Sequence, residues 1–442
     1  MTTPICDFVR EYKEKQSLRL HMPGHKGVNL LGFEHLDITE IDGADSLYEA
    51  DGIIAESEAN ASQLFGCDTF YSAEGSSQCI RAMLYLACIG ADKKPLIMAG
   101  RNAHKTFLSA AALIDFDIQW LYGDKQDSYL SCSISAEYLE KTLQNSERKP
   151  AAVYITSPDY LGNTADIKSL AQVCRRYGVM LVVDNAHGAY LKFMPQSQHP
   201  IDMGADMCCD SAHKTLPVLT GGAYLHIGKT VAEKYIPVVK NALAMFGSTS
   251  PSYIIMQSLD MANKYISDGY SEKLGQFCDK LKNIRNKLSA KGFQLAGDEP
   301  MKITISTKSY GYEGKEFAEI LADRNIVCEF SDPDFLVFMF TPEITDMQLD
   351  FFADAVCGIP KKAAVTVLPP IQQTAVKAMS VRDAAFSPSE EIPVEKATGR
   401  VLAAASVGCP PAVPIVVCGE IIDEKAVETF RYYGVDRCCV VK

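Results

Sequence analysis

The sequence lacks the features that mark membrane-bound, secreted and nucleic-acid-binding proteins. No apolar run approaches the ~18 residues of a membrane-spanning helix, and the first residues, MTTPICDFVREYKEKQ, contain no signal-peptide core. Basic residues are not in excess, since 43 Lys and Arg stand against 55 Asp and Glu, a formal charge of −12. We therefore expect a soluble, cytoplasmic protein without a nucleic-acid or membrane partner, whose acidity favours a small cationic partner.

Paired cysteine motifs are also missing. The chain has 15 cysteines but no C-x-x-C spacing, and the adjacent pairs Cys208–Cys209 and Cys438–Cys439 are poorly placed to hold one zinc ion. An odd number of cysteines without a secretory leader indicates reduced thiols, most of them buried as small apolar side chains. The sequence therefore predicts no metal-binding residue.

Helix-like and strand-like segments alternate through the first half of the chain. Strands separated by helices of about 10–15 residues predict βαβ units and a mainly parallel sheet, which is the α/β class. Two helical patterns end at Gly66 and Gly90. The expected strands are PLIMAG, AAVYITS, VMLVVDNA, ADMCCDSA and GGAYLHIG, and the expected helices include KTFLSAAALID and IKSLAQVCRRYG.

The order of these patterns predicts four parts. A long helical connector leads from the large domain into a smaller α/β unit, and a Pro-rich segment with its own strands and a last helix follows. We expect an N-terminal segment at 1–51, a large α/β domain at 52–262, a small α/β domain at 263–360 and a C-terminal α+β domain at 361–442.

Lys214 and Asp184 are the strongest chemical signals in the sequence. Lys214 lies in a turn directly after a strand-like run, where partial burial would lower its pKa and allow a Schiff base with an aldehyde. Asp184 ends the strand VMLVV, and a strand's carboxyl end points into the ligand crevice of an α/β sheet. If the ligand is pyridoxal phosphate, Asp184 would keep its ring nitrogen protonated. A surface lysine and a helix-capping aspartate are the plain alternatives.

Two further segments fit the same ligand. Gly75-Ser76-Ser77 opens a predicted helix, where backbone N–H groups, two hydroxyls and the positive helix end suit a phosphate, although an ordinary serine cap has the same pattern. His104 follows the strand PLIMA and is placed to stack on a planar ring, although such a histidine is commonly structural.

With these residues in order, the sequence resembles the ornithine/lysine/arginine decarboxylase group of fold-type I pyridoxal-phosphate enzymes. The similarity covers nearly the whole chain, and because its first block begins at residue 20 we expect no receiver-like domain of the kind that larger members carry at the N-terminus. It rests on five blocks: LHMPGHKG at 20–27, TEIDGADSL at 39–47, DNAHGA at 184–189, SAHKTLP at 211–217 and CPPAVPIVVCGE at 409–420.

The resemblance implies a role for each candidate residue. Lys214 would bond the cofactor aldehyde, Asp184 would pair with the ring nitrogen, and Lys214 or His213 would return the proton to the product. The remaining candidates would surround the cofactor: His104 and Ala186 against the two ring faces, His187 close by, and Gly75, Ser76, Ser211 and His213 at the phosphate, to which the Gly-Ser-Ser turn adds Ser77.

The implied activity is decarboxylation of arginine, lysine or ornithine to the amine and CO2, for polyamine synthesis or acid resistance. The resemblance also implies a homodimer or a larger even assembly. Two alternatives stay open: another pyridoxal-phosphate activity (an aminotransferase or an aldolase-type lyase), and a catalytically impaired regulatory relative. An aminotransferase usually needs a small-domain arginine, and only Arg285 and Arg324 occur there. Candidate partners for the distal cation of the substrate are Asp42, Asp45, Glu49 and Glu420.

Three departures from the group's pattern bear on the site. Asn185 replaces a glutamate, and Glu74 precedes the phosphate turn, where its carboxylate must point away, pair with a base or impair cofactor binding. In the last block, Cys409, Ala412 and Cys418 replace the usual Tyr, Gly and Pro.

Overall fold

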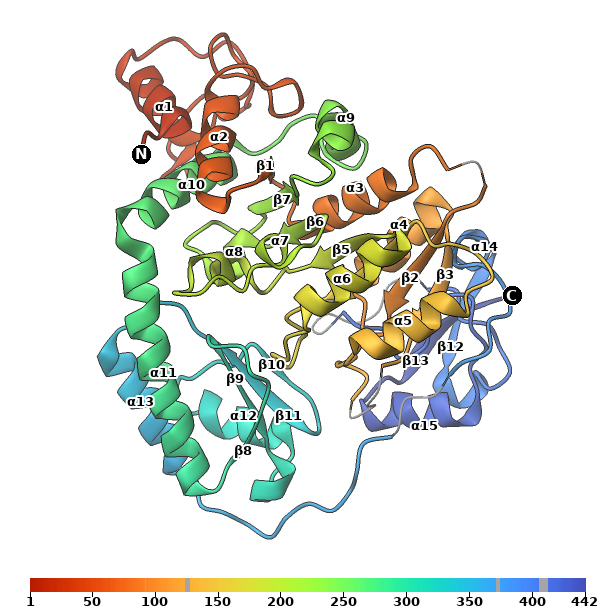
Figure 1. Cartoon of the computed structure of the whole chain (residues 1–442). Coiled ribbons are helices and arrows are strands. Elements are labelled where there is room, and N and C mark those ends of the chain that lie inside the picture. Colours follow the sequence, from red (N-terminus) through yellow and green to blue (C-terminus); the bar gives the residue numbers. More distant parts are fainter. Residues whose placement is uncertain (92, 124–127, 371–373, 405–411) are drawn as a thin grey trace. The chain divides into compact units, whose positions relative to one another are not determined.

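The computed structural model describes residues 1–91, 93–123, 128–370, 374–404 and 412–442. Within this part of the chain the largest sheet has seven strands. The β2–β3, β2–β4 and β5–β6 pairs are parallel, and β7 runs antiparallel to both of its neighbours, β1 and β6 (Figure 1). The mainly parallel α/β fold is therefore confirmed. The strand order is β1 (Asp68–Ser72), β7 (Ala223–Ile227), β6 (Met207–Asp210), β5 (Met180–Asp184), β4 (Ala152–Thr156), β2 (Leu96–Gly100) and β3 (Asp117–Leu121).

The chain divides into two compact units, and residues 1–90 and 167–273 form the first. Apolar periodicity explains its helices: in α6 (Ile167–Tyr177) the buried residues repeat at helical spacing, and α2 (Ile53–Phe65) ends where Gly66 adopts φ +68°. Its other helices and turns are α1 (Pro4–Glu14), η1 (Glu34–Leu36), η2 (Leu47–Glu49), α3 (Ser76–Cys88), η3 (Ala189–Phe193), α7 (Pro200–Met203), α8 (Ala212–Thr215), α9 (Ala232–Ala244), α10 (Tyr253–Tyr265) and η4 (Ile266–Tyr270).

Strand direction in the first unit brings three strand ends to one edge. β1 and β6 both run antiparallel to β7, so they are parallel to each other, and β5 is parallel to β6. The residues that follow β1, β5 and β6 therefore emerge at the same edge of the sheet. This edge carries nine of the ten predicted site residues.

The second unit comprises residues 91–166 and 274–442. Residues 294–339 of this unit contain a four-stranded antiparallel sheet, and residues 389–441 contain a two-stranded antiparallel sheet and a helix. Its elements are α4 (Lys105–Ile114), α5 (Ala136–Gln144), most of α11 (Ser271–Lys291), β8 (Gln294–Ala296), β9 (Lys302–Ser306), η5 (Lys308–Tyr310), α12 (Gly314–Ala322), β10 (Phe330–Ser331), β11 (Phe335–Met339), α13 (Asp346–Cys357), α14 (Val381–Phe386), β12 (Ser389–Pro393), η6 (Val394–Lys396), α15 (Glu424–Tyr432) and β13 (Arg437–Val441).

The structure adds detail that the sequence patterns did not predict. β1 and β3 were not expected, and β1 pairs with a strand about 150 residues further along the chain, which leaves no local signal. The helical connector is broken at Gly269, where φ is +103°. None of the described helices combines the length and the apolar character that crossing a membrane requires.

Candidate functional site

The turn from β1 into α3 forms an anion cradle. Gly75 is the N-cap of the 13-residue helix α3, has φ +71° and carries no side chain that could cap the helix. A Cβ added to Gly75 would meet nothing closer than the Ser77 nitrogen at 4.0 Å, so there is room beside Gly75 at the start of the helix. An open helix N-terminus binds phosphate through its N–H groups and its dipole.

Two serine hydroxyls meet beside this turn. Ser211, which is buried, follows β6, and its Oγ lies 2.8 Å from the Oγ of Ser76. The two residues are 135 positions apart, and the parallel ends of β1 and β6 bring them together. The predicted phosphate residues Gly75, Ser76, Ser77 and Ser211 thus lie in one place.

Lys214 and Asp184 lie at the same edge. Asp184 is the last residue of β5 and only 2% exposed, and its carboxylate accepts a hydrogen bond from the backbone N–H of Ala186 (3.2 Å). Lys214 lies on α8, directly after β6, and its Nζ is 2.9 Å from Nε2 of the buried His187. His187 and Lys214 therefore can share a proton.

His213 has a defined protonation pattern. Its Nδ1 lies 3.0 Å from the backbone carbonyl oxygen of Gly222, which can only accept, so Nδ1 carries the hydrogen and Nε2 holds a lone pair. Burial is the largest influence on the pKa of His213 and lowers it, and the charge of Lys214 acts in the same direction. The ring is therefore neutral near pH 7 and able to accept a proton at Nε2.

His104 belongs to the second compact unit, where it is the N-cap residue of α4. Its Nδ1 accepts a hydrogen bond from the backbone N–H of Thr106 (3.2 Å) and lies 2.9 Å from the Thr106 hydroxyl. The structural role that the sequence left open for His104 is thus present, and its ring-stacking role stays a prediction.

Two of the departures have clear structural consequences. The Glu74 carboxylate accepts a hydrogen bond from the backbone N–H of Ser248, so it is engaged with a backbone amide. Asn185 donates from Nδ2 to the Asp210 carboxylate at 2.6 Å, and both residues are fully buried. The sequence analysis did not predict that Asp210 is the hydrogen-bond partner of Asn185, although Asp210 directly precedes the candidate residue Ser211.

The third departure lies in the C-terminal block. Ala412 has φ +60°, a conformation that favours glycine and that explains why the group usually has Gly at this position. Cys418 is buried and its Sγ lies 3.0 Å from the carbonyl oxygen of Ala403. Cys409 lies outside the described residues.

Several charged side chains proposed for substrate contacts have structural partners. Glu420 is buried and paired with the buried Arg101 at 3.2 Å, and it also accepts from the Val417 backbone N–H. In the small domain, Arg285 donates to the carbonyl oxygens of Gly297 and Glu299, and Arg324 donates to that of Ala355. These contacts hold the fold together and weaken the aminotransferase alternative.

Family models, related sequences and solved structures all show similarity to amino-acid decarboxylases. The chain matches the model of the Orn/Lys/Arg decarboxylase major domain over residues 3–297 and that of the C-terminal domain of the same family over residues 361–437. Arginine decarboxylase of Bacillus subtilis is 29% identical over 463 residues, which cover 96% of this chain and 92% of that protein. Among solved structures, the constitutive lysine decarboxylase of E. coli matches with a TM-score of 0.76 and 18% identity, covering 100% of this chain and 82% of that chain. A lysine decarboxylase from Francisella novicida matches with a TM-score of 0.79 and 16% identity over 99% of this chain and 79% of that chain.

The first family model alone spans well over half of the chain, and the solved structures share its fold. The protein therefore belongs to the Orn/Lys/Arg decarboxylase family, whose members are pyridoxal-phosphate-dependent amino-acid carboxy-lyases.

Proposed function

We propose that this chain binds pyridoxal phosphate and decarboxylates a basic amino acid, with arginine as the first substrate to test. The observation that carries the proposal is the 2.9 Å contact between Lys214 and His187, at the sheet edge where Asp184 and the anion cradle also lie. The similar Bacillus subtilis protein is an arginine decarboxylase, which favours arginine over lysine and ornithine.

The residues of the first unit fit the cofactor in charge and in hydrogen-bonding type. The N–H groups at the start of α3 and the hydroxyls of Ser76 and Ser211 suit the phosphate, and the buried carboxylate of Asp184 suits a protonated ring nitrogen. Lys214 would form the covalent link. When bound, pyridoxal phosphate supplies an electron sink that stabilises the charge left by departing CO2.

The protein's own contribution is to hold protons and exclude water. His187, which is 6% exposed, lies within hydrogen-bond distance of the Lys214 amine, so a proton could pass between the two groups. His213 offers an unprotonated Nε2 whose tautomer is fixed by Gly222. Either Lys214 or His213 would then return the proton to the product, while Ala186 and His104 would flank the cofactor ring.

Covalent attachment of the cofactor is tested first. The purified protein is incubated with pyridoxal phosphate, reduced with borohydride and digested, and mass spectrometry should find the added mass on the peptide that contains Lys214. Lys214→Ala should lose the modification and the visible absorption band. The exposed Lys229, changed to alanine, is the matched control and should retain both. Attachment at another lysine would refute the assignment of Lys214.

The reaction is tested with arginine, lysine and ornithine, scoring CO2 and the amine separately. Release of CO2 with an equal amount of amine supports the proposal. Formation of a keto acid without CO2 would support the aminotransferase alternative, and covalent cofactor binding with no product from any of the three substrates would support a regulatory role.

The wider expectations belong to the same proposal. We propose the four-part division at 1–51, 52–262, 263–360 and 361–442, a cytoplasmic location, a role in polyamine biosynthesis and an even homo-oligomer. Sedimentation of the purified chain would test the oligomeric state.

A further inference from the structure

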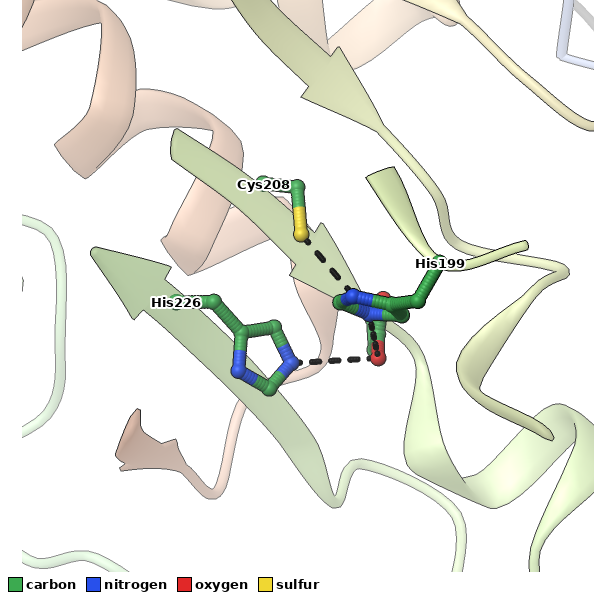
Figure 2. A group of neighbouring side chains, drawn as sticks. His199, Cys208 and His226 are labelled. Atoms are coloured by element: carbon green, nitrogen blue, oxygen red, sulfur yellow. Dashed lines mark hydrogen bonds and ion pairs between the residues drawn. The ribbon is translucent and has the colours of Figure 1, made fainter. Parts of the chain in front are cut away.

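Four buried side chains with metal-binding atoms converge on one face of the β6–β7 pair. Cys208 and Asp210 lie on β6, His226 lies on β7, and His199 is the residue before α7. All four residues are 0% exposed. Their side-chain donor atoms all lie within 4.8 Å of one another (Figure 2). Among the described residues, these four form the group of His, Cys, Asp and Glu side chains that is arranged closely enough to hold a metal ion.

Three of the six distances between the donor atoms come close to those around a tetrahedral zinc ion, and all six are within 4.8 Å. Nε2 of His199 and Nε2 of His226 each lie 3.1 Å from Oδ2 of Asp210, and Sγ of Cys208 lies 3.8 Å from Nε2 of His199. A tetrahedron with zinc–nitrogen and zinc–oxygen bonds of about 2.0–2.1 Å and a zinc–sulfur bond of about 2.3 Å separates its ligand atoms by roughly 3.2–3.8 Å. Figure 2 shows His199, Cys208 and His226 pointing toward one another.

The sheet register holds this geometry. Cys208 and His226 are direct partners across the β6–β7 pair, so their side chains lie on the same face of the sheet, and Asp210 lies two residues further along that face. Ligands on paired strands need little reorganisation to reach a metal, which favours a preformed site.

A second layer of hydrogen bonds surrounds two of the ligands. Nδ1 of His226 lies 3.0 Å from the hydroxyl of Thr69, and Oδ1 of Asp210 accepts a hydrogen bond from Nδ2 of Asn185 at 2.6 Å. Each of these two residues therefore keeps one atom for the cluster while its other polar atom is oriented by a partner. Metal ligands are commonly oriented in this way.

We propose that His199, Cys208, Asp210 and His226 form a closed structural site for zinc. Nitrogen, sulfur and oxygen donors in this combination suit zinc, and four protein ligands leave no open position for chemistry. The ion would join β6, β7 and the start of α7, and β6 leads directly into the helix that carries Lys214. This proposal does not depend on the decarboxylase activity. The competing explanation is a metal-free network in which both imidazoles donate hydrogen bonds to Asp210.

The metal content of the full-length wild-type chain provides the first test. The protein is produced in zinc-supplemented medium and dialysed against metal-free buffer, and its zinc is measured by mass spectrometry. We expect roughly one zinc ion per chain, as in other closed four-ligand sites. X-ray absorption should show one sulfur at about 2.3 Å and three nitrogen or oxygen atoms at about 2.0–2.1 Å.

Substitutions then assign the ligands. Cys208→Ala and His226→Gln should each lose most of the zinc. Cys174→Ala is the matched control, because Cys174 is a buried free cysteine on α6 outside the cluster, and it should keep the full amount. If the cluster variants do not fold, the zinc content and the X-ray absorption of the wild-type protein still test the proposal. Four results would each overturn the proposal. They are a wild-type protein without zinc, zinc coordination without sulfur, zinc retained by Cys208→Ala, and zinc lost from Cys174→Ala.

Discussion

Asp45 should act as a structural cap, and its substitution should reduce stability before it affects substrate binding. Gly52 is the N-cap of α2 and has no side chain to cap the helix. The Asp45 carboxylate supplies this function from outside the helix. Its Oδ1 accepts hydrogen bonds from the backbone N–H groups of Ser46 (2.8 Å) and Asp51 (3.1 Å), and its Oδ2 accepts from those of Gly52 (2.9 Å), Ile54 (2.9 Å) and Ala55 (3.3 Å).

The magnitude follows from these contacts. In Asp45→Asn the Oδ2 acceptor becomes an amide donor that faces the N–H groups of the helix start, and the remaining bonds lose their charge. The loss of a cap and of charge-assisted hydrogen bonds corresponds to about 2–4 kcal/mol, which lowers the midpoint of thermal unfolding by a few degrees. The exposed Asp42, changed to asparagine, is the matched control and should leave the midpoint unchanged.

The effect should also depend on pH. Desolvation opposes ionisation of Asp45, but the hydrogen bonds from its backbone partners together outweigh it and lower the pKa of the carboxyl. A lowered pKa stabilises the fold at pH values above the ordinary pKa of aspartate, and this stabilisation is lost as the pH falls toward the lowered value. The difference in midpoint between wild type and Asp45→Asn should therefore shrink below about pH 4.

Thermal unfolding followed by circular dichroism measures the stability, and steady-state kinetics with arginine, lysine and ornithine measure substrate binding. We expect a lower midpoint with an unchanged KM. A KM raised tenfold or more with an unchanged midpoint would refute this reasoning and would identify Asp45 as the partner of the substrate's distal cation.

Three further substitutions test other parts of the structure. Ser211→Ala removes the hydroxyl that contacts Ser76 and should raise the dissociation constant of pyridoxal phosphate by about tenfold in a fluorescence titration, since one hydrogen bond to a charged group contributes about 1.5–3 kcal/mol; unchanged affinity would place the phosphate elsewhere. Burial raises the pKa of Asp332 to about 6, so ionisation of this carboxyl destabilises the fold as the pH rises through that value. Asp332→Asn should therefore unfold at a higher denaturant concentration than the wild type at pH 8, but not below about pH 4. Equal unfolding curves of the two proteins at pH 8 would contradict this. Arg101→Met leaves the buried Glu420 without its cation and should reduce the free energy of unfolding by about 3–5 kcal/mol. The double variant Arg101→Met/Glu420→Gln should recover part of this loss. No recovery would show that the two side chains are not energetically coupled.

Local patterns were sufficient for most of the individual elements. The apolar run VMLVV and the helical pattern IKSLAQVCRRYG predicted β5 and α6, because burial of one face leaves its period in the sequence. β1 left no such signal, since its partner β7 lies far along the chain. The position of β1 nevertheless decides where α3 and its N-terminal turn begin.

The sequence by itself determined the α/β class, the order of the chemical residues and the resemblance to the decarboxylase group, because these depend on residue type and spacing. Only the tertiary structure decided which side chains meet. It brought Ser76 to Ser211 and Lys214 to His187, and it engaged Glu74 with the Ser248 amide. It also assembled the cluster at Cys208 from residues on separate elements, which no linear spacing reveals. Such contacts are set by strand order and direction, and these are properties of the folded sheet rather than of any local segment.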